Sequence, residues 1–307
     1  MFYNTENLFD TIDNHTTIDE DFTPIGRLKY DSERYHTKIE HTARVINEAV
    51  LDGMPEIIGL AEIENTDVLH DLVSKLNNSS DYSVHVGISR DIRGIENALI
   101  THSRFKSIKL ETHNIDLDEE RPTRPILALL LEDTETKIQY WVMVNHWPSR
   151  YGGVEASNWK RVRALETLSA AILKYRQNYP DAKIVVMGDF NDDSTTDNIK
   201  ALSKCETDSD PCLINTHAHI DGTGRGSYAY QGEWNMLDQI MVDKQLIDGS
   251  NLTWTKENAG DIVVKDWMLY ESTKYDDFLP TRTYAGNRYY GGYSDHLPVI
   301  LPFYNQR

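Results

Sequence analysis

The sequence has little cysteine and no long apolar run. Its two cysteines, Cys205 and Cys212, are too few among 307 residues for a disulfide-based scaffold. They leave open either one disulfide in an oxidising compartment or two free thiols. The longest apolar run, from Ile126 to Leu131, is far shorter than the roughly 18 residues that a transmembrane helix needs, so no membrane span is expected.

Positive charge is also scarce. The chain has 31 Lys and Arg residues against 49 Asp and Glu residues, which gives a formal net charge of −18. Nucleic acids and anionic membranes are held mainly by fields of Lys and Arg, so the charge argues against non-specific binding to either, although it leaves room for a local basic groove. The apolar share of 39% lies below the roughly 45–50% of an average domain. We therefore expect a soluble protein, and a monomer.

No secretory leader is visible in the sequence. Met1 stands directly before residues 2–4, which are expected to form a strand, and a first strand usually has residues ahead of it. The compartment stays open, and a periplasmic or secreted location is expected if a leader preceded Met1.

Helical and strand patterns alternate along the chain, with no repeat and no linker. Apolar spacing predicts helices over 32–51 and 157–178, and another around 69–76. The expected strands lie at 2–4, 57–61, 82–88, 97–101, 125–132, 138–145, 183–187, 237–242 and 297–303. Residues 260–293, rich in Tyr, Gly and Asp, are predicted to form a long ordered loop. Strands and helices in several layers favour a single domain over 1–307.

Polar residues follow or precede six of the expected strands. They are Asn4, Glu6, Glu62, Asn145, His146, Asp189, Asn191, Asp238, Asp295 and His296. A single Asp or Asn in such a place is more often a turn or a helix cap, and a lone His is more often a core residue. In layered α/β folds, however, ligands bind where strand ends gather. The joint pattern of carboxylates, amides and histidines therefore predicts a metal-assisted hydrolase.

Seven short stretches then carry a resemblance to a known family. They read YNTEN (3–7), LAEIEN (60–65), RGIENALI (93–100), VNHWPSR (144–150), MGDFND (187–192), WNMLDQI (234–240) and YSDHLPV (293–299). In this order they resemble the endonuclease/exonuclease/phosphatase superfamily, which includes deoxyribonuclease I, and especially bacterial members of unassigned substrate. The resemblance implies an α/β (α+β) fold of four layers, in which two mixed β-sheets pack face to face with helices outside.

The resemblance also implies a divalent cation, Mg²⁺ or Mn²⁺, with Glu62 as its main ligand. A carboxylate is a hard oxygen donor, which suits either ion. Asn4 and Glu6 would assist; they lie two residues apart on one strand, so both are expected to point to the same side. Glu6 stands where many relatives carry Asp. Asp295 would bind the metal or orient the catalytic network, and the choice between one metal and two stays open.

The catalytic roles follow from the same resemblance and from general chemistry. His296 is the predicted general base on the attacking water, and Asp238 would orient it. Asp189 and Asn191 would position the water and the phosphate, although some mechanisms of the family make the Asp the base. His146 would donate a hydrogen bond to a phosphate oxygen in the transition state.

Arginines and a tyrosine are predicted to bind the substrate. Arg150, Arg124 and Arg282 could each hold a phosphate through bidentate contacts, although a single arginine is more often in a surface or structural ion pair. Tyr284 could stack on a base or sugar, or could equally pack the loop that contains it.

Two histidine patterns do not predict a metal site. His36 with Glu40 and His41 misses the spacings of zinc proteases by one residue. His217 and His219 would share one side of a surface strand, with no third ligand evident.

We therefore expect a divalent-metal-dependent phosphoesterase that hydrolyses a phosphodiester or a phosphomonoester by water attack. One alternative is a DNA or RNA endonuclease or exonuclease of the same fold, which a basic stripe beside the site would favour. The other alternative is a catalytically silent module that binds a phosphate ligand.

Overall fold

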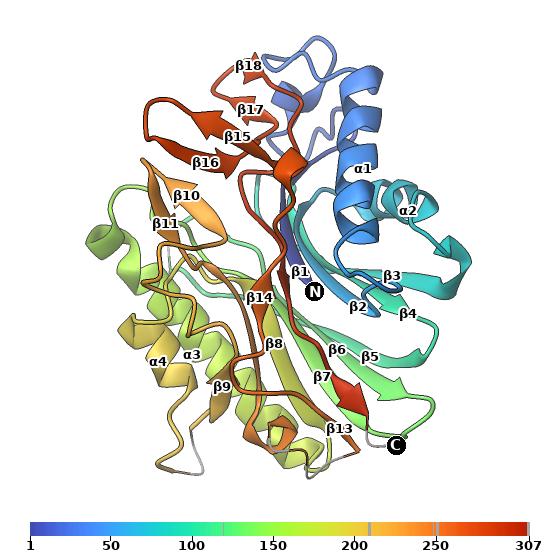
Figure 1. Cartoon of the computed structure of the whole chain (residues 1–307), viewed down its shortest axis with the longest axis vertical. Helices are drawn as coiled ribbons and strands as arrows, with labels where there is room; N and C mark the ends of the chain where they lie inside the picture. The colour runs from blue at the N-terminus through green and yellow to red at the C-terminus, as the bar shows by residue number, and fades with distance from the viewer. Residues whose placement is uncertain (119, 208–209, 248, 250–251, 306–307) are drawn as a thin grey trace.

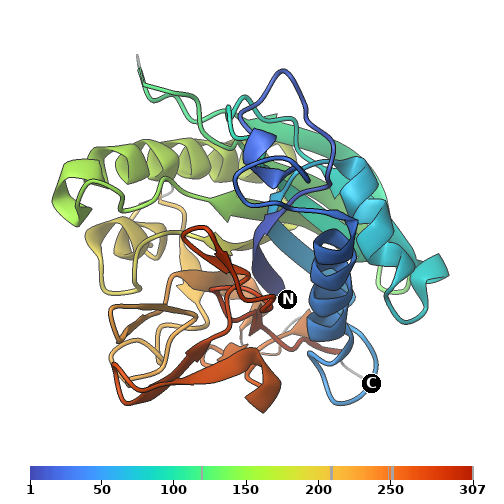
Figure 2. The same cartoon turned by 90° about the horizontal axis from the view of Figure 1, so that it is seen from above.

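Two six-stranded mixed sheets stack face to face in the computed structural model, which describes residues 1–118, 120–207, 210–247, 249 and 252–305. Helices α1 (Ser32–Asn47) and α2 (Thr66–Ser74) cover one outer face, and α3 (Val154–Asn178) and α4 (Asp197–Leu202) cover the other (Figures 1 and 2). The expected four-layer sandwich is confirmed. Within the described ranges, no helix combines the length and apolar character that a membrane span requires.

Each sheet contains one parallel pair of strands. In order across the first sheet, the strands are β14 (Asp261–Ile262), β19 (Val299–Ile300), β1 (Phe2–Leu8), β2 (Ile57–Ile63), β4 (Glu96–His102) and β3 (Tyr82–Val86). Across the second they are β5 (Phe105–His113), β6 (Ile126–Asp133), β7 (Gln139–His146), β8 (Lys183–Asp189), β12 (Asp238–Asp243) and β9 (Leu213–Asn215). The parallel pairs are β1–β2 and β7–β8. Parallel neighbours end at the same edge, and β12 begins there because it runs antiparallel to β8.

Close packing joins the two sheets. Gly59 on β2 has no side chain, and a Cβ there would lie 2.5 Å from Sδ of Met187 on β8. On the outer side of the second sheet, the rings of Trp141 and Tyr175 stack with centroids 3.7 Å apart, which joins β7 to α3. Helix α1 begins after Asp31, whose side chain accepts the Arg34 amide hydrogen as an N-cap.

Smaller hairpins and turns complete the fold. The remaining paired strands are β10 (Tyr228–Tyr230) with β11 (Glu233–Asn235), β15 (Leu269–Ser272) with β16 (Asp277–Pro280), β17 (Tyr284–Ala285) with β18 (Arg288–Tyr289), and β13 (Thr253–Trp254) with β20 (Tyr304–Asn305). The 3₁₀ turns are Glu20–Phe22, Ser79–Asp81, Lys244–Leu246 and Asp266–Met268. The β10–β11, β15–β16 and β17–β18 hairpins all lie toward the top of Figure 1.

Several local predictions were wrong. Residues 260–293 are not one loop, because they contain β14 and two hairpins whose strands are too short to show a periodic pattern. Strand β5 was missed, since its side chains are mostly exposed. The strand expected at 297–303 is shorter in the structure, where β19 covers only Val299–Ile300.

His217 is fully buried in a turn and not on a surface strand. Its ring fits only because residue 260 is glycine: a Cβ there would lie 2.4 Å from Cε1 of His217. Cys205 and Cys212, whose state the sequence left open, form a disulfide.

Candidate active site

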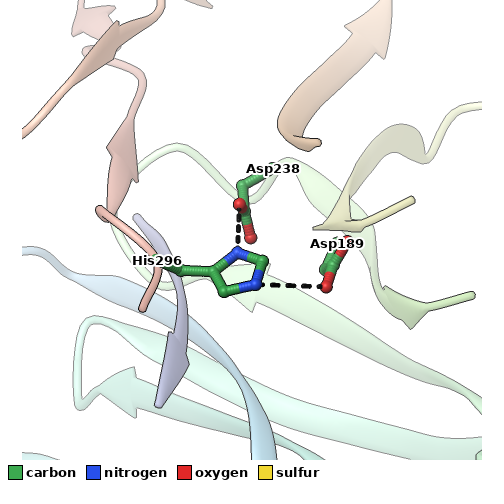
Figure 3. A group of neighbouring side chains, drawn as sticks. All are labelled: Asp189, Asp238 and His296. Atoms are coloured by element: carbon green, nitrogen blue, oxygen red, sulfur yellow. Dashed lines mark hydrogen bonds and ion pairs between the residues drawn. The ribbon is translucent and has the colours of Figure 1, made fainter. Parts of the chain in front are cut away.

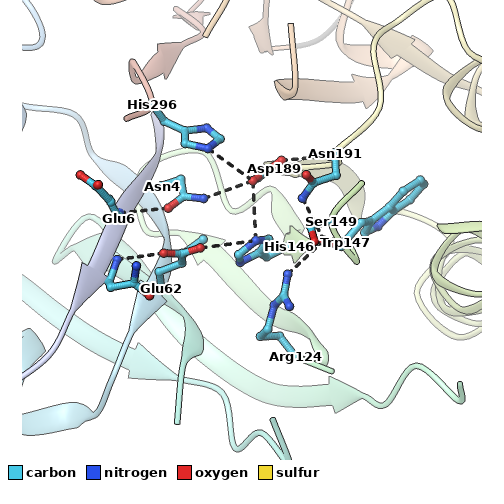
Figure 4. A network of polar contacts seen from close by, with 12 residues as sticks. Asn4, Glu6, Glu62, Arg124, His146, Trp147, Ser149, Asp189, Asn191 and His296 are labelled. Atoms are coloured by element: carbon cyan, nitrogen blue, oxygen red, sulfur yellow. Dashed lines mark hydrogen bonds and ion pairs between the residues drawn. The ribbon is translucent and has the colours of Figure 1, made fainter. Parts of the chain in front are cut away.

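The carboxyl ends of the two parallel strand pairs meet at one edge of the sandwich (Figure 4). Asn4 and Glu62 come from β1 and β2, while His146 and Asp189 are the last residues of β7 and β8. Every one of these positions follows a buried apolar run, so the sheets themselves carry the polar groups to a common place.

His296 lies between two buried aspartates (Figure 3). Its Nδ1 is 2.7 Å from Oδ2 of Asp238, and its Nε2 is 3.8 Å from Oδ2 of Asp189. Ser294 accepts the His296 amide hydrogen through Oγ and donates to the backbone oxygen of Asn4, which holds the histidine against β1. A carboxylate on one ring nitrogen fixes the tautomer and leaves the other nitrogen facing the site.

Asp189 is the meeting point of the network. Its Oδ2 accepts a hydrogen bond of 3.1 Å from Nδ2 of Asn4 and lies 3.6 Å from Nε2 of His146. The same His146 nitrogen is 3.8 Å from Oε1 of Glu62. Nδ1 of His146 is buried without a partner among the described residues. Residues of both sheets therefore converge within a few ångströms.

Three site residues have left-handed backbone conformations. The φ angles are +53° at Glu6, +64° at Glu62 and +51° at Asn191. The Asn191 amide donates to Oδ1 of Asp189, and its side chain donates to the backbone oxygen of Trp147. Such conformations are costly for residues other than glycine, and they cluster where a side chain must be aimed.

Burial and neighbouring charges shift the pKa values of Asp189, His146 and His296. Burial raises the pKa of Asp189 to about 7, against the lowering effect of His296. Burial, with the positive charges of Arg124 and Arg93, lowers the pKa of His146 well below its usual value. Burial alone would also lower the pKa of His296, but Asp238 and Asp189 raise it well above its usual value. These shifts favour the neutral form of His146 and the protonated form of His296.

Contrary to the prediction from strand alternation, the Glu6 side chain does not point to the same side as that of Asn4 (Figure 4), although the Glu6 amide donates to Oδ1 of Asn4 at 3.1 Å. The left-handed residues Glu6 and Asn7 interrupt the pairing of β1 with β2, and the Glu6 carboxylate turns away from Glu62 (Figure 4). Oε2 of Glu6 instead accepts the Thr283 amide hydrogen at 2.6 Å.

The three predicted arginines all border this edge, and each contacts a carboxylate. Arg124 is buried, donates to the Trp147 backbone oxygen at 3.0 Å and lies 3.4 Å from Asp91. The Nη2 atom of Arg150 is 2.7 Å from Oδ2 of Asp193, and the Nη2 atom of Arg282 is 3.3 Å from Oδ2 of Asp295.

Tyr284 is half-buried and lies outside this network. Its hydroxyl donates to the Leu28 backbone oxygen, and its ring lies against Tyr30 and Tyr289. These contacts are those of a residue that packs the segment containing it.

The donor set suits a divalent cation. Oxygens of Asp189 and Asp238 and a nitrogen of His296 lie within 4.8 Å of one another. A metal there would have to replace the short Asp238–His296 bond, however. Glu62 holds the Asn7 amide through Oε2 and leaves Oε1 beyond hydrogen-bond distance of His146. Hard oxygens with buried charge to neutralise are what Mg²⁺ and similar cations take, so the residues fit such an ion.

Sequence reasoning missed one residue that touches this network, Tyr228, and one that lies close to it, Lys38. Tyr228 lies against the His296 ring, with centroids 4.7 Å apart. Lys38 is the single buried lysine in the described part of the chain. Its position could have signalled this, because it shares the helical spacing of Tyr35 and Ile39 on the apolar face of α1.

The layers and the buried polar edge define a fold of the deoxyribonuclease I type. A model of the "Endonuclease/Exonuclease/phosphatase family" matches residues 1–305. The chain belongs to this family, whose members are hydrolases that act on phosphate esters. No curated protein matches the chain.

Solved structures of several family members are similar to this chain. The mannosyl-6-phosphatase Bt3783 of Bacteroides thetaiotaomicron is 14% identical, with a TM-score of 0.61 over 99% of this chain and 98% of its own. The catalytic domain of human Nocturnin is 17% identical, with a TM-score of 0.53 over 82% of each chain. Truncated TDP2 of Caenorhabditis elegans is 13% identical, with a TM-score of 0.56 over 90% of this chain and 93% of its own. At such identities the likeness establishes the fold.

Proposed function

We propose that this protein is a divalent-metal-dependent phosphoesterase that cleaves a small phosphomonoester or phosphodiester by water attack. The observation that carries the proposal is the buried His296, with Asp238 on one ring nitrogen and Asp189 facing the other. Such a pair can take a proton from water and stabilise the resulting imidazolium.

His296 is the proposed general base, and Asp238 orients it. Asp189 and Asn191 position the attacking water and the phosphate. In support, the short Asp238–His296 contact fixes the ring and leaves Nε2 directed toward Asp189. His146, whose pKa is lowered, remains a neutral donor toward a phosphate oxygen as negative charge develops.

Glu62 is the proposed main ligand of Mg²⁺ or Mn²⁺. Asn4, Glu6 and Asp295 are the proposed assisting residues, although the Glu6 carboxylate turns away from Glu62 in this structure (Figure 4). When bound, the cation would stabilise charge on the phosphate oxygens and favour the unprotonated form of His296. Glu62 is already aimed by its left-handed backbone and by its bond to the Asn7 amide.

A small substrate is favoured over a nucleic acid duplex. The chain carries a net charge of −18, and Arg124, Arg150 and Arg282 each contact an aspartate, which leaves little unbalanced positive charge for a long polyanion. These arginines are the proposed phosphate contacts. A full-length structural relative is named as a mannosyl-6-phosphatase, which agrees with a small phosphate ester.

The test is a hydrolysis panel with and without Mg²⁺ or Mn²⁺. The panel holds sugar phosphates, nucleotides, inositol phosphates, a nitrophenyl diester, sphingomyelin, plasmid DNA and RNA. We expect metal-dependent turnover of a small ester, and His296→Ala should lower kcat by about 10²–10⁴-fold. Asp238→Asn should cause a similar loss. His36→Ala, which removes an exposed histidine on α1, is the control and should leave kcat unchanged.

Other outcomes would change the assignment. Cleavage of DNA or RNA in preference to every small ester would make the protein a nuclease. Tight binding of phosphate ligands without turnover of any panel member would favour the silent binding module.

A further inference from the structure

Lys38 occupies an unusual position for a lysine. It lies on the inner face of α1, and only 1% of it is exposed. Its Nζ donates to Oγ1 of Thr283 at 2.6 Å and to the backbone oxygen of Tyr293 at 2.7 Å. Burying an ammonium group costs free energy unless the group is hydrogen-bonded. The two hydrogen bonds of Lys38 offset this cost, which indicates that the contacts with Thr283 and Tyr293 have a specific role.

Thr283 is held from two directions. Lys38 binds its hydroxyl, while the carboxylate of Glu6 at the end of β1 accepts its backbone N–H. Thr283 follows Arg282 directly, and Arg282 contacts Asp295. The two hydrogen bonds to Thr283 therefore also restrain the preceding residue, Arg282, which is a proposed phosphate contact.

Tyr293 is held by three successive turns of α1. Lys38 binds its backbone oxygen, the ring of His41 stacks on its ring with centroids 4.3 Å apart, and Arg44 donates to its hydroxyl. Tyr293 is followed by Ser294, whose Oγ supports the backbone of His296. The Lys38 ammonium group thus bonds both ends of the segment 283–293. Arg282 directly precedes this segment, and His296 follows it by three residues.

We propose that Lys38 is a positioning residue of the active site, which holds Arg282 through Thr283 and His296 through Tyr293. The proposal rests on the proposed function for its kinetic consequences, but its structural consequence can be measured without any substrate. Helix α1 lies beside the segment with β17 and β18 (Figure 1), and the cation–π contact of Arg34 with Tyr289, 4.4 Å from the ring centre, joins the two as well.

The structural test is amide hydrogen exchange over residues 281–296 in three variants. Lys38→Met keeps the length and apolar contacts of the side chain and removes both hydrogen bonds. Thr283→Val removes only the hydroxyl and serves if Lys38→Met does not fold. Lys174→Met on α3, whose Nζ is bonded to Glu111 at the surface, is the matched control. We expect faster exchange over 281–296 in Lys38→Met, over residues around 283 in Thr283→Val, and no change there in the control.

The kinetic test separates KM from kcat on the best substrate of the panel. Lys38→Met should lower kcat/KM by about 10–100-fold, the loss expected for hydrogen bonds to a charged group, with both KM and kcat affected. Thr283→Val touches only the Arg282 side, so it should mainly raise KM. The double variant should be no worse than Lys38→Met, because both changes break the same connection.

Two results would overturn the proposal. In the first, Lys38→Met folds and is less stable, but its exchange rates over residues 281–296, its kcat and its KM equal those of the parent. Lys38 would then be a purely structural residue. In the second, Thr283→Val leaves both exchange and KM unchanged. If no panel member is hydrolysed by the parent protein, the proposed function fails, while hydrogen exchange still decides whether Lys38 holds this segment.

Discussion

At the scale of single residues, the position of Glu96 on β4 disfavours the charged form of its carboxylate. Its Oε1 accepts the Ser89 amide hydrogen at 2.8 Å, but Oε2 is buried without a partner among the described residues. Burial raises the pKa of Glu96 to about 8, and Asp91 raises it as well. The folded state therefore binds this proton more tightly than the unfolded state, whose pKa is near 4.5.

The sign of the pH dependence follows from that difference. The stabilisation from protonated Glu96 is complete below about pH 4.5 and is lost as the pH rises toward 8. Glu96→Gln removes the charge and keeps the acceptor for Ser89. We expect it to raise the free energy of unfolding at pH 8.5 by about 1–2 kcal/mol and to change it little at pH 5. Urea denaturation at a series of pH values measures this effect. The exposed Glu257→Gln is the control, and an equal gain at every pH would contradict the prediction.

At the scale of elements, the interruption shared by β1 and β2 shapes the metal side of the site. The pairing of these strands shifts between Asn4 and Leu8, and β2 is also irregular against β4 between Ala61 and Ile63. The Asn7 amide, at a φ of +57°, donates to Oε2 of Glu62 at 2.8 Å. A regular strand pair would point these groups to alternate faces, so the bulge aims Glu62.

Substitutions at Asn7 test whether its left-handed conformation matters. Asn7→Gly should keep the stability of the parent, because glycine adopts a positive φ without strain. Asn7→Val should lower the free energy of unfolding by about 1–2 kcal/mol, since a β-branched residue resists that conformation. Chemical denaturation of both variants gives the comparison. Asn77→Val makes the same change at an exposed position without a positive φ, and equal losses at the two sites would rule out backbone strain as the cause.

At the scale of the whole molecule, the excess of acidic residues dominates the electrostatics. Eighteen negative charges have no basic counterpart, so the folded state repels itself at low ionic strength. Salt shortens the distance over which charges interact from about 30 Å at 0.01 M to about 8 Å at 0.15 M.

We therefore expect the unfolding temperature to rise by a few degrees as NaCl is increased from about 10 to about 150 mM, because screening weakens this repulsion. Differential scanning calorimetry at fixed pH measures the change. Sucrose at matched osmolality controls for effects of water activity. A fall in the unfolding temperature would mean that ion pairs such as Arg104–Asp133 outweigh the net repulsion.

Much of the fold was accessible from the sequence, and the failures have local causes. Buried strands such as β2 and β8 were predicted because the short, mostly apolar stretches 57–61 and 184–187 leave a clear pattern. The hairpins within residues 260–293 were missed because strands of two to four residues leave none. Likewise, the Glu6 and Asn4 side chains were expected on the same side because alternation assumes a regular strand, which the bulge interrupts.

The sequence by itself determined the family, the four layers and the residue types available for chemistry, because each motif is a continuous stretch that can be read without knowing its neighbours. Only the tertiary structure decided which of these groups meet. Asp238 and His296 are 58 residues apart, and Asn4 and Asp189 are 185 apart, yet both pairs are in contact. Lys38 reaches Thr283 across 245 residues. Such contacts depend on the register of the strands and on the packing of α1, which no local pattern encodes.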